Sequence, residues 1–205
     1  MDHNVNNVQM LYDDALYLHN TLVVGGDASA DSILSDLFQG IENLKNNWKG
    51  RDAGYRIQEV IRIYNAMVAV RNALSQLAAD SVRVAVNYRE IQIANGVRDA
   101  DALSTINVEF KNYIQDYSDT SDTIDISSAA EEGKRFIDSA NELLETFEND
   151  VKFRYQYIMD NWTRGTGRDS ARGAYDLFLA NVNKYKQILT DVSSNITKAL
   201  QNYTF

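Results

Sequence analysis

The 205-residue sequence contains neither proline nor cysteine. At an average usage of about 5%, roughly ten prolines are expected in a chain of this length. Because proline interrupts the interior of a helix, its absence favours long uninterrupted helices. The lack of cysteine excludes disulfides, thiolate metal sites and cysteine nucleophiles, but it leaves the cellular compartment open.

Basic residues and long apolar runs are also scarce. The 20 Lys and Arg residues stand against 29 Asp and Glu residues, which gives a net charge of −9. Binding to phosphates needs clustered basic side chains, so we expect no nucleic-acid partner. The apolar runs fall far short of the roughly 20 residues of a membrane-spanning helix, and the N-terminus lacks the basic flank and apolar run of a Sec signal peptide. We therefore expect no stable membrane insertion.

Residues that carry chemistry are few and scattered. The only histidines, His3 and His19, are sixteen residues apart in the first predicted helix. Adjacent carboxylates such as Glu131 and Glu132 point in different directions around a helix and do not converge on a substrate. We therefore predict no catalytic, metal or cofactor site, and we expect that the protein is not an enzyme.

Apolar residues recur at alternating spacings of three and four, which is typical of helices with one buried face. From Val60 to Ile91 they form a regular seam that only Ser81 interrupts, and this predicts a helix of about forty residues that ends at Asn95-Gly96. Similar spacing predicts helices over 5–24, 34–48 and 128–162, and another beyond the second corner. It also predicts a short helix over 99–117, with this apolar face: Leu103, Ile106, Phe110, Tyr113 and Tyr117.

The two tryptophans mark two helix corners. Trp48-Lys49-Gly50 lies between two apolar seams, and Trp162 lies 114 residues later in a similar position, with Gly165 after it. Nine positions of the second seam, from Tyr175 to Tyr203, match the first seam from Val60 to Tyr88 at an offset of 115 without a gap. The chain therefore reads as one helical hairpin followed by a looser second copy.

These patterns predict an all-α protein. We expect two antiparallel helical hairpins that pack their seams together as a four-helix-bundle-like core, because a lone hairpin exposes part of its apolar seam. Residues 1–96 form the first hairpin with an N-terminal short helix, and residues 97–205 form the second with a short helix before it. The two hairpins pack within one chain, as an intramolecular pseudo-dimer, or between the chains of a homodimer.

A hairpin with Trp-x-Gly at its bend and a tyrosine about forty residues later resembles the WXG family of small proteins exported by bacterial type VII secretion. Residues 1–96 fit this pattern well, with Trp48-Lys49-Gly50 as the literal motif. In that family, the bend and a C-terminal Tyr-x-x-x-Asp/Glu motif of the partner chain form a composite export signal that an FtsK/SpoIIIE-type ATPase reads. Here Gln92 stands at the fourth position after Tyr88, and the sequence ends shortly after Tyr203.

The resemblance implies a non-enzymatic secretion substrate or component that acts through helix–helix recognition and leaves the cell without a Sec signal. Two alternatives stay open. One is a cytosolic adaptor or targeting chaperone for a larger secreted helical toxin, and the other is a structural helical bundle unrelated to secretion. The ATPase and the toxin are the corresponding protein partners.

Six residues are candidates for partner recognition or the secretion signal: Trp48, Gly50, Tyr88, Trp162, Gly165 and Tyr203. Each also has a plainer interpretation. The tryptophans close the ends of the core, the tyrosines belong to the seam, where a hydroxyl at the bundle end reaches water, and the glycines serve backbone geometry. A basic cluster around the second corner is either a solvated helix end or a contact face for an acidic partner; it comprises Lys152, Arg154, Arg164, Arg168 and Arg172.

Overall fold

The computed structural model describes residues 7–26, 29–97, 101–120, 129–162 and 166–203, and within these ranges it contains helices and no strand. The all-α prediction is therefore confirmed. In chain order the elements are α1 (Val8–Tyr17), the π-helical stretch η1 (Leu18–Val23), α2 (Ala30–Asn47), α3 (Arg51–Ala94), α4 (Ala129–Thr146), the π-helical stretch η2 (Phe147–Val151), α5 (Lys152–Asn161) and α6 (Thr166–Tyr203).

Local signals in the sequence set the ends of the first helices. The side chain of Asn7 accepts a hydrogen bond from the backbone N–H of Met10 and begins α1, and Ser29 does the same for Ser32 at the start of α2. The helix α3 runs for 44 residues and ends at Asn95-Gly96, where Gly96 has a φ of +73°. The predicted stop at Asn95-Gly96 is confirmed, and the left-handed glycine accounts for it.

The helix α3 is the centre of the molecule. Its predicted seam is buried from Val60 to Val84, Tyr88 is half-buried, and Ile91 is exposed. Other faces of α3 are buried as well, at Ile57, Ile61 and Val68 among others. The helix packs against α1, α2 and η1 on one side and against α6 on another, so a single amphipathic stripe does not describe it.

In the second half of the chain, α4, η2 and α5 follow each other without a break and form the first arm, and α6 forms the second. The predicted seam of α6 is buried at Tyr175, Phe178, Val182, Leu189 and Val192, and half-buried at Tyr185. The side chains of the later seam positions, Ile196, Ala199 and Tyr203, lie outside the described residues. The hydroxyl of Tyr175 donates to the backbone carbonyl of Phe147, where η2 begins.

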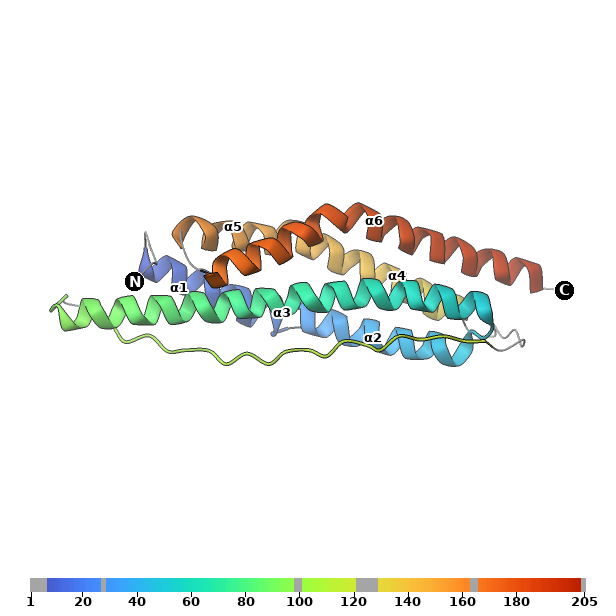
Figure 1. Ribbon diagram of the computed structural model, residues 1–205, viewed down its shortest axis with the longest axis horizontal. Coiled ribbons are helices and arrows are strands. Elements are labelled where there is room, and N and C mark those ends of the chain that lie inside the picture. Colours follow the sequence, from blue (N-terminus) through green and yellow to red (C-terminus); the bar gives the residue numbers. More distant parts are fainter. Residues whose placement is uncertain (1–6, 27–28, 98–100, 121–128, 163–165, 204–205) are drawn as a thin grey trace.

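The long helices of the two halves run in opposite directions. Figure 1 shows α3 and α6 side by side and antiparallel, and α2 and α4 are antiparallel in the same way. Contacts between α1 and α5 complete the packing. As a result, the α2–α3 connection lies toward one end of an elongated molecule, and the end of α5 and the start of α6 lie toward the other (Figure 1).

Residues 101–120 form an extended segment along α3 (Figure 1), which we call the strap. The prediction of a helix over 99–117 is wrong for the residues the structure describes. The chain leaves α3 at one end, and α4 begins at the other, so the connection must cover the length of α3, about 66 Å at 1.5 Å per residue. Twenty extended residues span about that distance by themselves, and their backbone is bonded to side chains of α3 instead of within a helix.

None of the helices in the described part of the chain combines the length and the apolar character that crossing a membrane requires.

Candidate functional site

Both corner tryptophans are core residues. Trp48 is 3% exposed and Trp162 is 1% exposed, and each belongs to the continuous apolar core. Each is the C-cap of the helix before its corner, with its backbone N–H donating to the carbonyl four residues earlier, Leu44 at 2.9 Å and Ile158 at 2.8 Å. The indole rings therefore close the ends of the core and offer almost no surface to a partner.

Gly50 is held in a conformation that favours glycine. Its φ of +112° and ψ of 167° lie in a region that side chains with a Cβ rarely adopt. Gly50 is the N-cap of α3, and its backbone N–H donates to the carboxylate of Asp119 at 3.0 Å. This carboxylate comes from the end of the strap and lies at the positive end of the α3 dipole, where an anion is stabilising. The strap therefore covers part of the first corner.

The remaining candidate residues are less informative. Tyr88 is half-buried and packs against the core near the end of α3. Gly165 lies outside the described residues. Tyr203 is the last residue of α6, and its side chain also lies outside them. The structure does not bring Trp48 and Tyr88 together, because they lie near opposite ends of α3.

Three members of the basic cluster near the second corner have partners within the chain. The Arg154 guanidinium pairs with Asp14 of α1 at 2.7 Å and stacks over the ring of Tyr17, 4.1 Å from its centroid. Arg168 donates to the backbone carbonyl of Trp162 at 2.6 Å, and Arg172 pairs with Asp176. Arg164 lies outside the described residues. The contacts of Arg154 tie α5 to α1 and that of Arg168 closes the second corner, which favours an internal role for these two, whereas the Arg172 pair is exposed on α6.

Along α3, three side-chain amides hold the strap, and we call Gln58, Asn65 and Asn72 the amide ladder. The amide of Asn72 donates to the carbonyl of Lys111 and accepts from its N–H, both at 2.9 Å. Asn65 makes the same pair with Ile114, at 2.8 and 2.9 Å. Gln58 accepts from the N–H of Tyr117 at 2.5 Å and donates to the carboxylate of Asp116 at 2.6 Å.

The repeat of the amide ladder matches the repeat of an extended chain. Its members are seven residues apart on α3, a rise of about 10.5 Å. Their partners Lys111, Ile114 and Tyr117 are three residues apart on the strap, which in an extended chain span about 10 Å. The strap therefore keeps its register along the ladder without accumulating a mismatch. The strap runs antiparallel to α3, because the residues 111, 114 and 117 of the strap pair in that order with 72, 65 and 58 of α3.

Both ends of the strap are fixed as well. The hydroxyl of Tyr12 donates to the backbone carbonyl of Ser104 and accepts from the backbone N–H of the same residue, both at 3.2 Å. Arg89 donates to the carbonyl of Asp101 at 3.3 Å. At the other end, the strap backbone touches α3 at Gly54, where a Cβ would lie 2.5 Å from the amide nitrogen of Asp119. Gly54 therefore provides the space for this close approach.

A buried ion pair connects the strap to α2 and α3. The guanidinium of Arg71, 2% exposed, makes a two-pronged pair with Asp31 at 2.7 Å for each bond. Its remaining nitrogen donates to the carbonyl of Glu109 on the strap at 2.5 Å. Burial, and secondly the charge of Arg71, lower the pKa of His19. The neutral form of His19 is thus favoured next to Arg71, whose charge is already paired with Asp31. This environment suits a structural role for His19.

Only some side chains of the strap face the core, and their spacing differs from that of a helix. Leu103, Ile106, Ile114 and Tyr117 pack against the core, and Lys45 lies over the ring of Tyr117 at 5.5 Å. Phe110 and Tyr113, which belong to the predicted helical face, are each 58% exposed. The inward pairs 103 with 106 and 114 with 117 are three residues apart, which fits neither the period of a helix nor that of a strand, so the helical prediction assigned Phe110 and Tyr113 to the wrong side.

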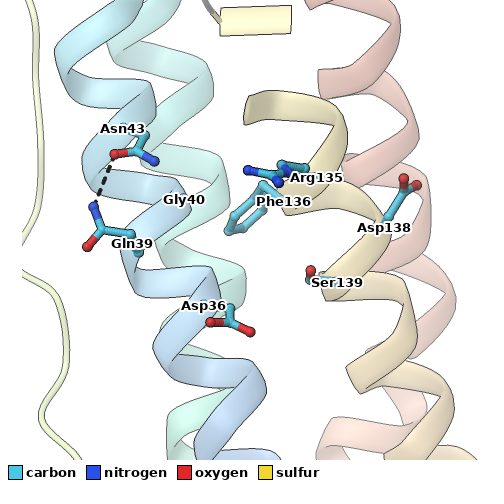
Figure 2. Close-up of a pocket in the computed structure, with 8 residues that line it drawn as sticks. All are labelled: Asp36, Gln39, Gly40, Asn43, Arg135, Phe136, Asp138 and Ser139. Atoms are coloured by element: carbon cyan, nitrogen blue, oxygen red, sulfur yellow. Dashed lines mark hydrogen bonds between the residues drawn. The ribbon is translucent and has the colours of Figure 1, made fainter. Parts of the chain in front are cut away.

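An open cleft lies between α2 and α4. Figure 2 shows Asp36 and Arg135 directed into it, with the ring of Phe136 against Gly40, whereas Asp138 points away. A Cβ at Gly40 would lie 3.2 Å from Cδ2 of Phe136, so this glycine sets the close approach of the two helices. The charges are mixed and do not converge. The cleft therefore offers no arrangement that indicates catalysis.

The amide ladder and the residues around it bind the backbone of the strap. Among the described residues, we find no arrangement of side chains that indicates a chemical reaction. Over these residues, no group of three or more His, Asp or Glu side chains is placed to hold a metal ion. Sequence reasoning missed the amide ladder. Its signal is visible as Gln58, Asn65 and Asn72 at one heptad position, two residues before the seam positions Val60, Met67 and Leu74.

The chain was also compared with known proteins: no family model, no curated protein and no solved structure matches it.

Proposed function

We propose that this chain is a non-enzymatic, WXG-like substrate or component of a type VII secretion system that acts through helix–helix recognition. One observation carries the proposal: the two hairpin corners lie toward opposite ends of the molecule, because α3 and α6 are antiparallel neighbours (Figure 1). This is the arrangement expected when two WXG-like hairpins that pair antiparallel are joined in one chain. The monomer is then a pseudo-dimer.

The ends of the molecule resemble the composite signal in their placement but not in the Tyr-x-x-x-Asp/Glu motif, since Gln92 stands at its acidic position after Tyr88. The C-terminal end of α6 lies at the same end as the α2–α3 connection, and the C-terminal end of α3 lies toward the α5–α6 connection (Figure 1). The first corner is thus near the end of α6, whereas α3 continues past the second corner (Figure 1). An FtsK/SpoIIIE-type ATPase that reads a bend together with a neighbouring helix end finds both parts within this one chain.

The surface that such a partner reads cannot be the indole rings, which are buried. It consists of the side chains around each corner. Asp52 and Asp169 occupy the first turns of α3 and α6, and their side chains are 73% and 68% exposed. They are matched probes of the two corners. We assign recognition to the first corner because it carries the literal Trp-Lys-Gly motif.

The test is export of the tagged protein by a bacterial host that carries a type VII system. Export that stops when the gene of the secretion ATPase is deleted supports the proposal. Asp52→Lys is then expected to reduce export at least tenfold, with Asp169→Lys close to wild type. Equal export with and without the ATPase contradicts it.

Retention in the cytosol distinguishes the two alternatives. If the retained protein co-purifies with a larger helical toxin, it is an adaptor, and the corner substitutions are expected to leave this complex intact. If it is retained with neither ATPase nor toxin bound, a structural helical bundle is the better description.

A further inference from the structure

The amide ladder binds atoms that every polypeptide has. Asn65 and Asn72 each satisfy the N–H and the C=O of one strap residue, as a neighbouring strand does in a sheet. Main-chain pairing of this kind provides affinity in peptide recognition, while pockets for particular side chains provide specificity. The ladder therefore has the properties of a peptide-binding surface.

Specificity comes from the side chains beside the ladder. Ile114 and Tyr117 pack against the core, and Tyr117 lies beneath the ammonium group of Lys45. The carboxylate of Asp119 accepts from Gly50 at the start of α3. At the other side, the ammonium group of Lys111 lies 3.9 Å from the carboxylate of Asp31. The pattern that fits is thus a basic residue, then an apolar residue, an aromatic residue and an acidic residue, at the spacing of 111, 114, 117 and 119.

We propose that the ladder face of α3, together with the adjoining edge of α2, is a binding site for an extended polypeptide segment in trans, and that the strap is its built-in occupant. The ligand is an extended segment of the type Lys-x-x-Ile-x-x-Tyr-x-Asp. Proline is excluded at the three ladder-paired positions, because each must present an N–H. The proposal does not depend on the secretion proposal.

The strap competes with any such ligand. A tethered segment acts at an effective concentration in the millimolar range for short flexible linkers, so a free peptide of similar intrinsic affinity binds the intact chain weakly. Weakening the strap's own contacts makes the site available. Ile106 and Ile114 are suitable positions, since both are apolar, half-buried and packed on the core.

The experiment uses a fluorescein-labelled peptide of residues 103–119 and measures anisotropy. The strap-opened chain, Ile106→Asp with Ile114→Asp, is expected to bind the peptide at least tenfold more tightly than the wild-type chain. Adding Asn65→Ala and Asn72→Ala is expected to weaken that binding by tenfold or more, whereas adding Asn181→Ala on α6 leaves it unchanged. A peptide with Asp in place of Ile114 is expected to bind poorly.

Two results overturn the proposal: a folded strap-opened chain that does not bind the peptide, or binding that the ladder substitutions do not weaken. Circular dichroism establishes that the variant is folded. If it is not, protease sites introduced between residues 97 and 101 and between 120 and 129 release the strap from the otherwise wild-type chain. The cleaved complex must then exchange its strap for the labelled peptide, and failure to do so also overturns the proposal.

Discussion

Asn72 and Lys111 lie 39 residues apart in the chain, and the side-chain amide of Asn72 pairs with both backbone polar groups of Lys111 at 2.9 Å. The pairing explains how a long connection without secondary structure stays in place. Backbone groups at a half-buried surface need partners, and a strap outside a sheet has no neighbouring strand to supply them. The heptad amides of α3 take that role.

The ladder predicts a stability difference between two asparagines. Asn72→Ala removes both hydrogen bonds to the backbone of Lys111 and a longer one from Arg71 at 3.3 Å, so we expect a loss of about 1–3 kcal/mol in the free energy of unfolding. Asn181→Ala is the matched control, since Asn181 lies in α6 and, within the part of the chain that the structure describes, donates only to the carbonyl of Leu177, one turn earlier. Both substitutions gain the same helix propensity. Urea unfolding followed by circular dichroism measures the difference, and equal values for the two variants contradict the role of the ladder.

A pair of helical glycines tests the close approach of the strap to α3. Gly173→Ala adds a Cβ in open space on α6 and is expected to stabilise the protein by up to about 1 kcal/mol through helix propensity. Gly54→Ala gains the same propensity, but its Cβ meets the backbone of Asp119. We therefore expect it to stabilise less or to destabilise.

The amide of Gly50 reports on the same contact. It is bonded to the carboxylate of Asp119, so displacement of the strap in Gly54→Ala is expected to speed its hydrogen exchange. Equal stabilisation by the two alanines, with unchanged exchange at Gly50, means that the strap does not lie against Gly54.

Two buried tyrosines predict how stability depends on alkaline pH. Burial, and secondly the charge of Asp176, raise the pKa of Tyr155 to about 12, and burial also raises the pKa of Tyr175. Unfolded phenols ionise near pH 10, so the folded state favours the neutral form. The resulting stability is fully present below about pH 10 and falls above it, and the contribution of Tyr155 is lost as the pH rises from about 10 to 12.

Unfolding midpoints in urea at pH 8 and pH 11 measure this effect. The midpoint is expected to fall between the two values in the wild-type chain and to fall less in Tyr155→Phe. Tyr55→Phe, which alters a residue that is 59% exposed, is the control. A fall as large in Tyr155→Phe as in the wild type removes Tyr155 as a cause.

The helices follow from local patterns in the sequence. The three-and-four spacing from Val60 to Val84 identifies buried residues of α3, and Asn95-Gly96 identifies its end. These predictions succeed because burial of an apolar stripe and the backbone freedom of glycine act over a few residues. The corner tryptophans were predicted as closures of the core, and both are buried.

The strap could not be predicted in this way. Its apolar residues, from Leu103 to Tyr117, fit a helical spacing as well as they fit any other. What holds the segment extended is the set of hydrogen bonds between its backbone and the side chains of α3, and these partners are known only once the fold is known. The ladder was missed for a related reason, because amides beside a seam are ordinary solvent-facing residues until a partner for them is known.

The distance between the two ends of the strap tests the account most directly. The chain has no cysteine, so Ala102→Cys with Ser118→Cys introduces two unique attachment points for spin labels, both at exposed positions. An extended strap along the ladder predicts a distance of about 50 Å between these positions by pulsed electron paramagnetic resonance. A helix over the same sixteen residues gives about 24 Å. A distribution centred near 24 Å contradicts the strap, and with it the ladder as a site for extended chains.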